Sequence, residues 1–371
     1  MNNFKRTLTF RDSVFLGLSS MIGAGLFVNV SPAAFISSYS LVFGLLIASI
    51  LAFSNASSSA QLANVYPETG GTYLYARKVL GSKASLLAGV AFVIGKIISS
   101  IAIALTFGNY LFPSSHRLVG IALVVAVGIV SYFGATKTAS VSKWFVYSVL
   151  GILLFYIFSV VSSENFSFVI PITDGLTIES LLLSSSIWFF AFTGYSRLAT
   201  FGEEVKNPET IIPKAILTGL GITVSLYFLT TYATLGIVDP AVIQNSLTPL
   251  KVAFDISRFS SFSFLISIAS TIATGSVLLA LVPGISRVIV AMSRDNYLPT
   301  LLGKIHKKYN SAYFSDILIS LIIVTGILYF DVVEAIKISS FFILVYYSLT
   351  NYTVIKLEKS KRLYNVFIAY F

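Results

Sequence analysis

The chain has 371 residues, of which 56% are apolar and only 11% are charged, and its mean hydropathy is +0.87. These values exclude an ordinary water-soluble domain and are typical of a protein that crosses a lipid bilayer several times. The chain contains no cysteine and only two histidines, so disulfides and thiolate metal sites are excluded and zinc or redox chemistry has little support.

The net charge of +10 has to be explained, because a strongly basic chain can indicate nucleic acid binding. With the N-terminus inside, nineteen of the 25 Lys and Arg fall on the cytoplasmic tail and loops, and three fall on the opposite side. This is the positive-inside bias of a multi-pass protein. It predicts a cell-membrane protein with a cytoplasmic N-terminus, a cytoplasmic C-terminal tail and no nucleic acid partner.

Apolar segments long enough to cross about 30 Å of hydrocarbon recur along the whole chain. We predict ten spans, near residues 12–37, 41–65, 84–112, 118–133, 144–162, 177–203, 212–237, 261–293, 312–330 and 333–355. The polar head "MNNFKR" runs into the first span without the small-residue cleavage pattern of a signal peptide, so this span is expected to belong to the mature protein. One transmembrane domain is therefore expected over residues 1–371.

Two spans carry interruptions. The first holds "IGAG" (Ile22 to Gly25), and the sixth holds "FFAFTGYS" (Phe189 to Ser196), which Thr193 and Gly194 interrupt. Small residues also let transmembrane helices pack closely, so one such pair carries little weight. However, the first and sixth spans are corresponding positions if five spans are repeated as five, and paired breaks indicate a transporter built from inverted repeats with a midplane site.

Such breaks suggest a ligand chemistry. The amides at the start of the following half-helix carry partial positive charge and suit a carboxylate. The freed carbonyls on the other side suit an ammonium group or a metal cation. A zwitterionic amino acid presents both groups.

Four motifs resemble those of the amino acid-polyamine-organocation (APC) superfamily of permeases, of the prokaryotic amino acid transporter type. They are "MIGAGLF" from Met21, "YPETGGTYLYARKVLG" from Tyr66, "FFAFTGYSRLATFGEEVKNPETIIPKAI" from Phe189 and "SRVIVAMSRDNYLP" from Ser286. The resemblance implies an all-α integral membrane protein with the inverted-repeat (5+5) LeuT-like fold and discontinuous first and sixth helices.

The same resemblance implies a first repeat over about residues 12–162 and a second over about 177–355. Residues 356–371 are then a cytoplasmic tail or the start of an eleventh helix, since the family usually has two further helices. Whether the protein is a monomer or a homodimer stays open.

The family's substrate site carries over residue by residue. The substrate carboxylate is expected at the amides of Gly23, Ala24 and Gly25, and the ammonium at carbonyls around Met21 and from Phe189 to Phe192. Phe190 matches an aromatic residue that closes over substrate in relatives, although a packing or lipid-facing role is the alternative. The full set of expected substrate-binding residues is Ser20, Met21, Gly23, Ala24, Gly25, Gly95, Lys96, Ser100, Phe189, Phe190, Ala191, Phe192 and Gly194. No catalytic residue, metal ligand or cofactor is expected.

Lys96 stands about midway along the third span, about twelve residues from either end. An ammonium at that depth costs roughly 2.5–3.5 kcal/mol even on insertion scales, so it is expected to face a cavity or a partner rather than lipid. Two roles remain open: a lysine that cycles its proton during transport, or a permanent cation that replaces a sodium ion or pairs with an acid. Lys337 and Arg197 rank lower because both can reach water or a helix terminus.

Sodium coupling is the alternative to proton coupling. Hydroxyls of the eighth span could help to hold sodium beside the first-span carbonyls, while packing and bonding to their own helix is the simpler interpretation. These hydroxyls belong to Ser270, Thr271, Thr274 and Ser276.

The sequence therefore predicts a secondary active amino acid transporter that works by alternating access. Proton coupling is favoured, and neutral or acidic substrates are favoured over cationic ones. A sodium-coupled carrier, an exchanger and a non-transporting amino acid sensor remain alternatives. A membrane enzyme is not expected, because no span contains a nucleophile, base or metal set.

Overall fold

The protein is described here by a computed structural model that covers residues 6, 8–66, 71–133, 138–169, 176–201, 205–309 and 311–358. The described residues are almost entirely helical, and their β-structure is limited to one isolated parallel bridge between Leu8 and Val205.

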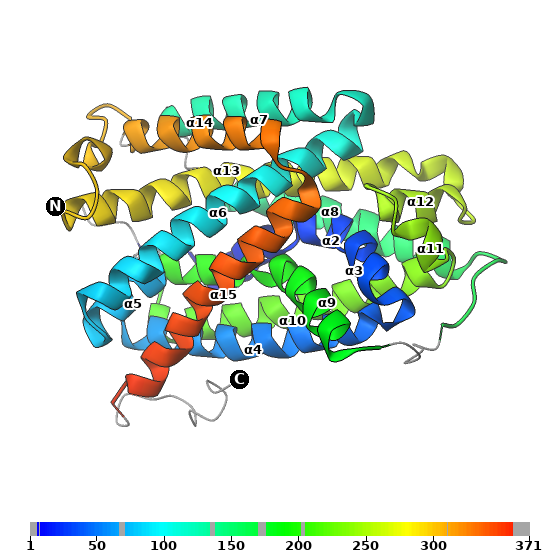
Figure 1. Cartoon of the computed structure of the whole chain (residues 1–371), viewed down its shortest axis with the longest axis horizontal. Coiled ribbons are helices and arrows are strands. Elements are labelled where there is room, and N and C mark those ends of the chain that lie inside the picture. The colour runs from blue at the N-terminus through cyan, green and yellow to red at the C-terminus, as the bar shows by residue number, and fades with distance from the viewer. Residues whose placement is uncertain are drawn as a thin grey trace.

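The first half of the described chain, up to the loop after residue 161, is mainly helical (Figure 1). They are α1 (Phe10–Met21), α2 (Ala24–Val28), α3 (Val30–Ser37), η1 (Ser38–Ser40), α4 (Leu41–Val65), α5 (Gly71–Val79), α6 (Ser82–Leu111), η2 (Pro113–Ser115), α7 (His116–Tyr132) and α8 (Thr138–Val161).

The second half contains α9 (Ile178–Phe192), η3 (Tyr195–Phe201), α10 (Pro208–Leu235), α11 (Pro240–Ile243), α12 (Pro249–Asp255), η4 (Ser260–Phe262), α13 (Phe264–Arg294), η5 (Thr300–Gly303), α14 (Tyr313–Tyr329) and α15 (Val332–Lys356). Each of the ten predicted apolar segments is helical. The largest boundary differences are at α8 and α10, which begin at Thr138 and Pro208 rather than near residues 144 and 212.

Seven helical stretches of the described chain are long and apolar enough to cross a membrane, and α14 is a shorter apolar helix. The stretches that begin with α1 and α9 are not among them as whole spans, because each is divided by the break that its sequence predicts. The chain is therefore a multi-pass membrane protein with an interrupted first and sixth segment.

The first break lies between the end of α1 and the start of α2. A capping box between Thr9 and Asp12 starts α1, whose last residue is Met21. Gly23 then adopts an extended backbone (φ −146°, ψ −153°) and caps α2, so the chain direction changes between the two half-helices. Any residue can adopt this conformation, so the glycine here is not required by its backbone angles.

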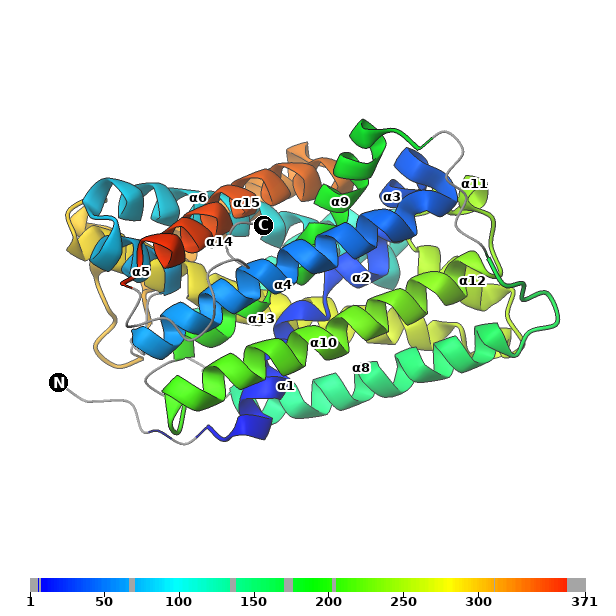
Figure 2. The same ribbon diagram turned by 90° about the horizontal axis from the view of Figure 1, so that it is seen from below.

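Packing brings the two broken segments to the centre of the molecule. α4 lies against both α9 and α10, and α1 lies against α8 and α10, as Figure 2 shows from below. α6 packs along α15 and α13 on the other side, and α7 pairs with α14 at one edge (Figure 1). The breaks themselves are thereby buried, and irregular backbone at membrane depth is shielded from lipid, although α3 and α9 keep exposed apolar side chains.

Candidate substrate site

The two helix breaks touch each other directly. A Cβ added to Gly25 would lie 2.4 Å from the Cα of Ala191, and one added to Gly194 would lie 2.1 Å from the carbonyl oxygen of Ser20. Side chains at these two positions would collide with backbone. Gly25 and Gly194 are therefore required by the close approach of the first and sixth segments.

The amides at the start of α2 are the first polar feature of the site. Gly23, Ala24 and Gly25 have no hydrogen-bond acceptor for their N–H groups within the described chain, and Ala24 is 1% exposed. Buried N–H groups without acceptors are rare in folded proteins. This part of the site can therefore accept an anion such as a carboxylate.

Carbonyl oxygens from both breaks meet at one tyrosine. The hydroxyl of Tyr227, on α10, lies 2.6 Å from the carbonyl oxygen of Met21 and 3.0 Å from that of Ala191. One hydroxyl proton serves two acceptors, so this donor holds the two half-helices together while leaving acceptor capacity for a further donor. The sequence analysis did not identify Tyr227, and only its position in the middle of the seventh span could have indicated it.

Replacing Tyr227 with phenylalanine should lower the melting temperature of the substrate-free protein. The change leaves two buried carbonyls without their donor, which corresponds to about 1–3 kcal/mol of stability. Tyr232→Phe, on the same helix, is the matched control and should melt like the unaltered protein. Equal melting temperatures of the two variants would mean that the hydrogen bonds of Tyr227 to the two breaks contribute nothing to the stability of the protein.

The aromatic residues of the sixth segment are buried. The Phe192 ring lies 5.0 Å from that of Tyr227, and the Phe189 ring lies 5.8 Å from that of Tyr347. Phe190 is 5% exposed, and its carbonyl accepts hydrogen bonds from the amide and hydroxyl of Thr193. A lipid-facing role for Phe190 is thereby removed, and its gating role stays a prediction.

Lys96 reaches the second break. Its side chain is 4% exposed, and Nζ donates a hydrogen bond of 2.9 Å to the carbonyl oxygen of Thr193. The same carbonyl oxygen lies 3.0 Å from the hydroxyl of Tyr347. Within the described ranges no carboxylate lies in ion-pair distance of Lys96. The amine therefore bonds to the freed backbone of the sixth segment and not to an acid.

The two other expected residues of the third span make contacts within or beside their own helix, and their substrate-binding roles stay predictions. A Cβ on Gly95 would meet Ile343 at 3.0 Å, so Gly95 faces α15 and permits close helix packing. The hydroxyl of Ser100 donates to the carbonyl of Lys96 at 2.8 Å, within its own helix. Of these three residues in the described chain, Lys96 is the one whose side chain hydrogen-bonds to a helix break.

The eighth-span hydroxyls are mostly engaged within α13. Each of three hydroxyls donates to a backbone carbonyl oxygen: Thr271 to that of Ser267 at 2.7 Å, Thr274 to that of Ser270 at 2.6 Å and Ser276 to that of Ala273 at 2.9 Å. The hydroxyl of Ser270 itself is buried and has no partner in the described chain. Val277 is the α13 residue nearest to Gly23, at 3.1 Å from a Cβ built there. This arrangement matches the packing interpretation of these hydroxyls, and their sodium role stays a prediction.

Arg197 lies closer to the site than its sequence position indicated. Its guanidinium donates to the hydroxyl of Ser20 at 3.1 Å, which links η3 to the end of α1. Ser20 is in turn bonded to the carbonyl of Leu16. Ser20 is thus part of a polar link between the two broken segments.

The predicted inner ends of the helices are tied together by charged residues. Asp12 of α1 pairs with Lys143 of α8, and Asp295 accepts hydrogen bonds from Arg77 and Tyr73 of α5. Burial of the Tyr73 hydroxyl, together with the Asp295 carboxylate, raises the pKa of this tyrosine. Two of the motifs in the sequence, "YLYARK" and "SRDNY", therefore meet in space. Residues 67–70 and 202–204, which belong to the motifs from Tyr66 and Phe189, lie outside the described residues.

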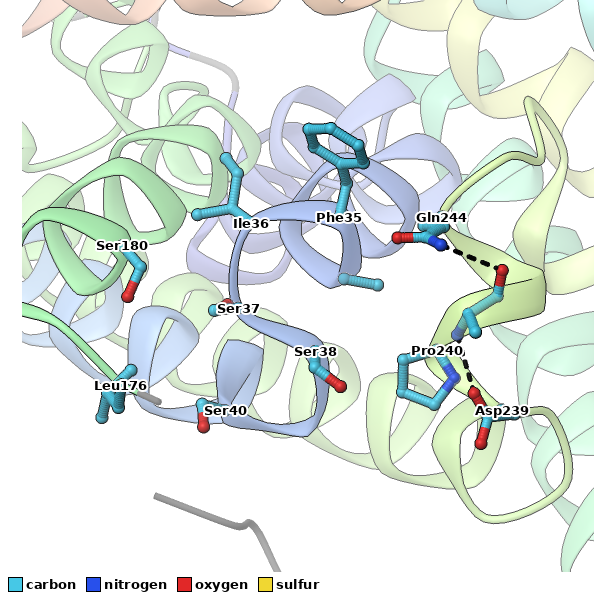
Figure 3. Close-up of a pocket in the computed structure, with 12 residues that line it drawn as sticks. Phe35, Ile36, Ser37, Ser38, Ser40, Leu176, Ser180, Asp239, Pro240 and Gln244 are labelled. Atoms are coloured by element: carbon cyan, nitrogen blue, oxygen red, sulfur yellow. Dashed lines mark hydrogen bonds between the residues drawn. The ribbon is translucent and has the colours of Figure 1, made fainter. Parts of the chain in front are cut away.

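The opposite ends are tied as well, around a separate cavity of 280 Å³ (Figure 3). Ser31 donates to the carbonyl of Ser246 at 2.6 Å, and the Tyr39 hydroxyl lies 3.3 Å from Asp239. Serines line the cavity beside Asp239, Gln244 and Phe35. Polar contacts thus join the helices at both ends of the molecule.

Two broken helices that meet at the centre of a polytopic helical membrane protein are typical of transporters. The sequence comparison makes this specific, because the family model described as "Amino acid permease" matches residues 12–370, and the chain belongs to this family. It is therefore an amino acid transporter of the APC superfamily, embedded in a membrane, and not an enzyme.

Similar proteins come from bacteria and from a plant. The chain is 36% identical over 361 residues to an uncharacterized transporter of Mycobacterium tuberculosis, covering 96% of this chain and 81% of that protein. It is 24% identical to the branched-chain amino acid permease BcaP of Bacillus subtilis, over 84% of this chain and 72% of the permease. It is 26% identical to the vacuolar cationic amino acid transporter 2 of Arabidopsis thaliana, over 82% of this chain and 52% of that protein.

Proposed function

We propose that the protein is a secondary active transporter that moves an amino acid by alternating access around the two helix breaks. The observation that carries the proposal is the complementary chemistry of the breaks. Acceptor-free amides of Gly23 to Gly25 lie on one segment, and the carbonyls of Met21 and Ala191 meet nearby. A carboxylate and an ammonium on one carbon atom fit this pair of charges.

The architecture proposed for this cycle is the five-plus-five inverted repeat with cytoplasmic termini. Rocking of the broken helices against an unbroken scaffold exposes the central site to one side at a time. The inner pairs Asp12–Lys143 and Arg77–Asp295 and the outer contact between Tyr39 and Asp239 are the ties that must open in turn. The protein is proposed to work in the cell membrane.

Counterflow in proteoliposomes tests the transport proposal. Vesicles loaded with an unlabelled amino acid should transiently accumulate the labelled one, and the uptake should saturate. A sensor that binds without transport would bind the label and show no counterflow. An exchanger would show counterflow but no net uptake into empty vesicles.

The coupling ion is proposed to be a proton carried by Lys96. The amine bonds to the broken backbone and has no acid partner in the described chain, so rearrangement of the sixth segment changes its surroundings directly. In the sodium alternative, the α13 hydroxyl oxygens would be the ligands: those of Thr271, Thr274 and Ser276 donate to carbonyls of their own helix and keep lone pairs for a cation, and that of Ser270 has no partner in the described chain.

Substrate selectivity follows from the same lysine. Like charges about 6 Å apart cost on the order of 3 kcal/mol at an effective dielectric near 20, so an ammonium on Lys96 disfavours a cationic side chain. The relatives do not decide the matter, because their names include branched-chain and cationic amino acids.

Arginine and lysine should therefore compete poorly for uptake, by about a hundredfold relative to neutral amino acids. The measurement is competition by a panel of amino acids against a labelled neutral substrate. Lys96→Met, which removes the charge and keeps most of the side-chain length, should narrow the difference in apparent affinity between cationic and neutral amino acids. High-affinity arginine uptake by the unaltered protein would contradict this selectivity.

A further inference from the structure

An apolar groove of 310 Å³ lies between α7 and α14, far from the helix breaks. The two helices lie side by side at one edge of the molecule (Figure 1). The groove is lined by Val125, Gly128, Ile129, Tyr132, Phe133, Ile317, Ser320, Leu321 and Val324. From residue 125 to residue 133 it follows α7 for about 12 Å, at about 1.5 Å per residue.

The walls of the groove are open to the surroundings. Ile129 is 54% exposed and Leu321 is 60% exposed, so these side chains are not covered by another part of the described chain. At its floor, a Cβ on Gly128 would lie 2.8 Å from the Ser320 hydroxyl, so the glycine lets the two helices approach. An elongated apolar group fits this shape.

One end of the groove is basic. Lys304, Lys307 and Lys308 follow one another in the loop before α14, and the sequence has no acidic residue between Asp295 and Asp316. All three lysines are exposed, and none pairs with a carboxylate in the part of the chain that the structure describes.

Direct contacts fix this basic loop to the groove. The Nζ of Lys308 lies 5.2 Å from the centre of the Tyr309 ring, and that ring lies 5.1 Å from the ring of Phe133, which lines the groove. The hydroxyl of Ser311 donates to the carbonyl of Tyr132 at 2.6 Å. The Lys308 ammonium is thereby held at one end of the groove, with Lys307 next to it in the chain, at the end that the predicted topology places in the cytoplasm.

We infer that the groove binds an anionic phospholipid of the bilayer, with one acyl chain between α7 and α14 and the phosphate against Lys307 and Lys308. Charge complementarity selects this occupant, because basic pockets between helices on the cytoplasmic side hold acidic lipid headgroups. A second copy of the chain would bring the same three lysines towards the same edge in a symmetric contact, and like charges would repel.

Native mass spectrometry of the purified full chain tests the inference. The protein is titrated with dioleoyl phosphatidylglycerol and, in parallel, with dioleoyl phosphatidylcholine, which has the same chains and no net charge. One phosphatidylglycerol should bind per chain with clear preference. The double variant Lys307→Gln, Lys308→Gln should lose about thirtyfold in affinity for it, since each basic residue near an anionic lipid contributes about fivefold.

A second variant tests the apolar part separately. Ile129→Trp places a large ring in the groove without disturbing a buried residue, and it should weaken binding of both lipids. The matched controls are Lys83→Gln with Lys214→Gln for the charges and Leu154→Trp, on the exposed face of α8, for the ring. Neither control should change lipid binding, and melting curves check that all variants are folded.

Two outcomes would overturn the inference. The first is unchanged phosphatidylglycerol binding in the double lysine variant or in Ile129→Trp. The second is a dimer that Ile129→Trp converts to monomer without any loss of bound lipid, which would assign the groove to a second copy of the chain. Neither measurement depends on transport, so the result stands apart from the proposed function.

Discussion

Replacing Lys96 with alanine should abolish accumulation of substrate driven by a pH gradient and leave exchange of substrate for substrate intact. A carrier is driven by protons only if its two states bind the proton differently, because substrate and proton binding are then thermodynamically linked. Lys96 is the candidate because its buried amine bonds to the carbonyl of Thr193 inside the broken sixth segment. Without the amine, the substrate ratio across the membrane should stay at about one.

One further variant distinguishes proton release by Lys96 from its positive charge, and another serves as a control. Lys96→Arg keeps a permanent cation that does not release its proton, and it should also fail to accumulate substrate. Lys337→Ala removes an exposed lysine from α15 and should accumulate normally. Proteoliposomes with pH and sodium gradients imposed separately give the measurement. Accumulation that needs sodium, ignores pH and is lost in Thr274→Ala would assign coupling to the α13 hydroxyls instead.

Replacing Gly23 with leucine should abolish substrate binding. The side chain would occupy the space beside the acceptor-free amides of Gly23 to Gly25, and hydrogen bonds to a charged group are worth about 1.5–3 kcal/mol each. Loss of two such bonds corresponds to more than about a hundredfold in affinity. Equilibrium binding of a labelled amino acid in detergent measures this loss of affinity. Amino acids amidated at the carboxyl group should also compete poorly for binding to the unaltered protein.

The structure makes Gly23 a cleaner test than Gly25. A Cβ at Gly23 meets the side chain of Val277 at 3.1 Å, whereas a Cβ at Gly25 meets the backbone of Ala191 at 2.4 Å. Gly25→Leu should therefore lower stability as well as binding. Gly221→Leu is the matched control, because a Cβ there meets nothing within 4 Å. Gly23→Leu protein that melts normally and binds substrate with unchanged affinity would remove the carboxylate from this position.

The sequence alone determined the membrane class, the helical segments and the two breaks. Long apolar runs leave few alternatives in a bilayer, because every backbone group must be satisfied within a helix. For the same reason "IGAG" and "AFTGYS" could be read as interruptions, and α4 was predicted with the bounds Leu41–Val65 that the structure has. The depth of Lys96 and the four family motifs also came directly from the order of residues.

Only the tertiary structure decided which groups meet. Lys96 and Thr193 are 97 residues apart, and Tyr227 and Met21 are 206 apart, so neither contact leaves a local signal. In a soluble helix the polar face shows which side points outwards, but in a bilayer both lipid and helix interface are apolar, and helix rotation is left open. Gly95 therefore matched a substrate-facing position in sequence and faces α15 in the structure, while the neighbouring Lys96 reaches the break.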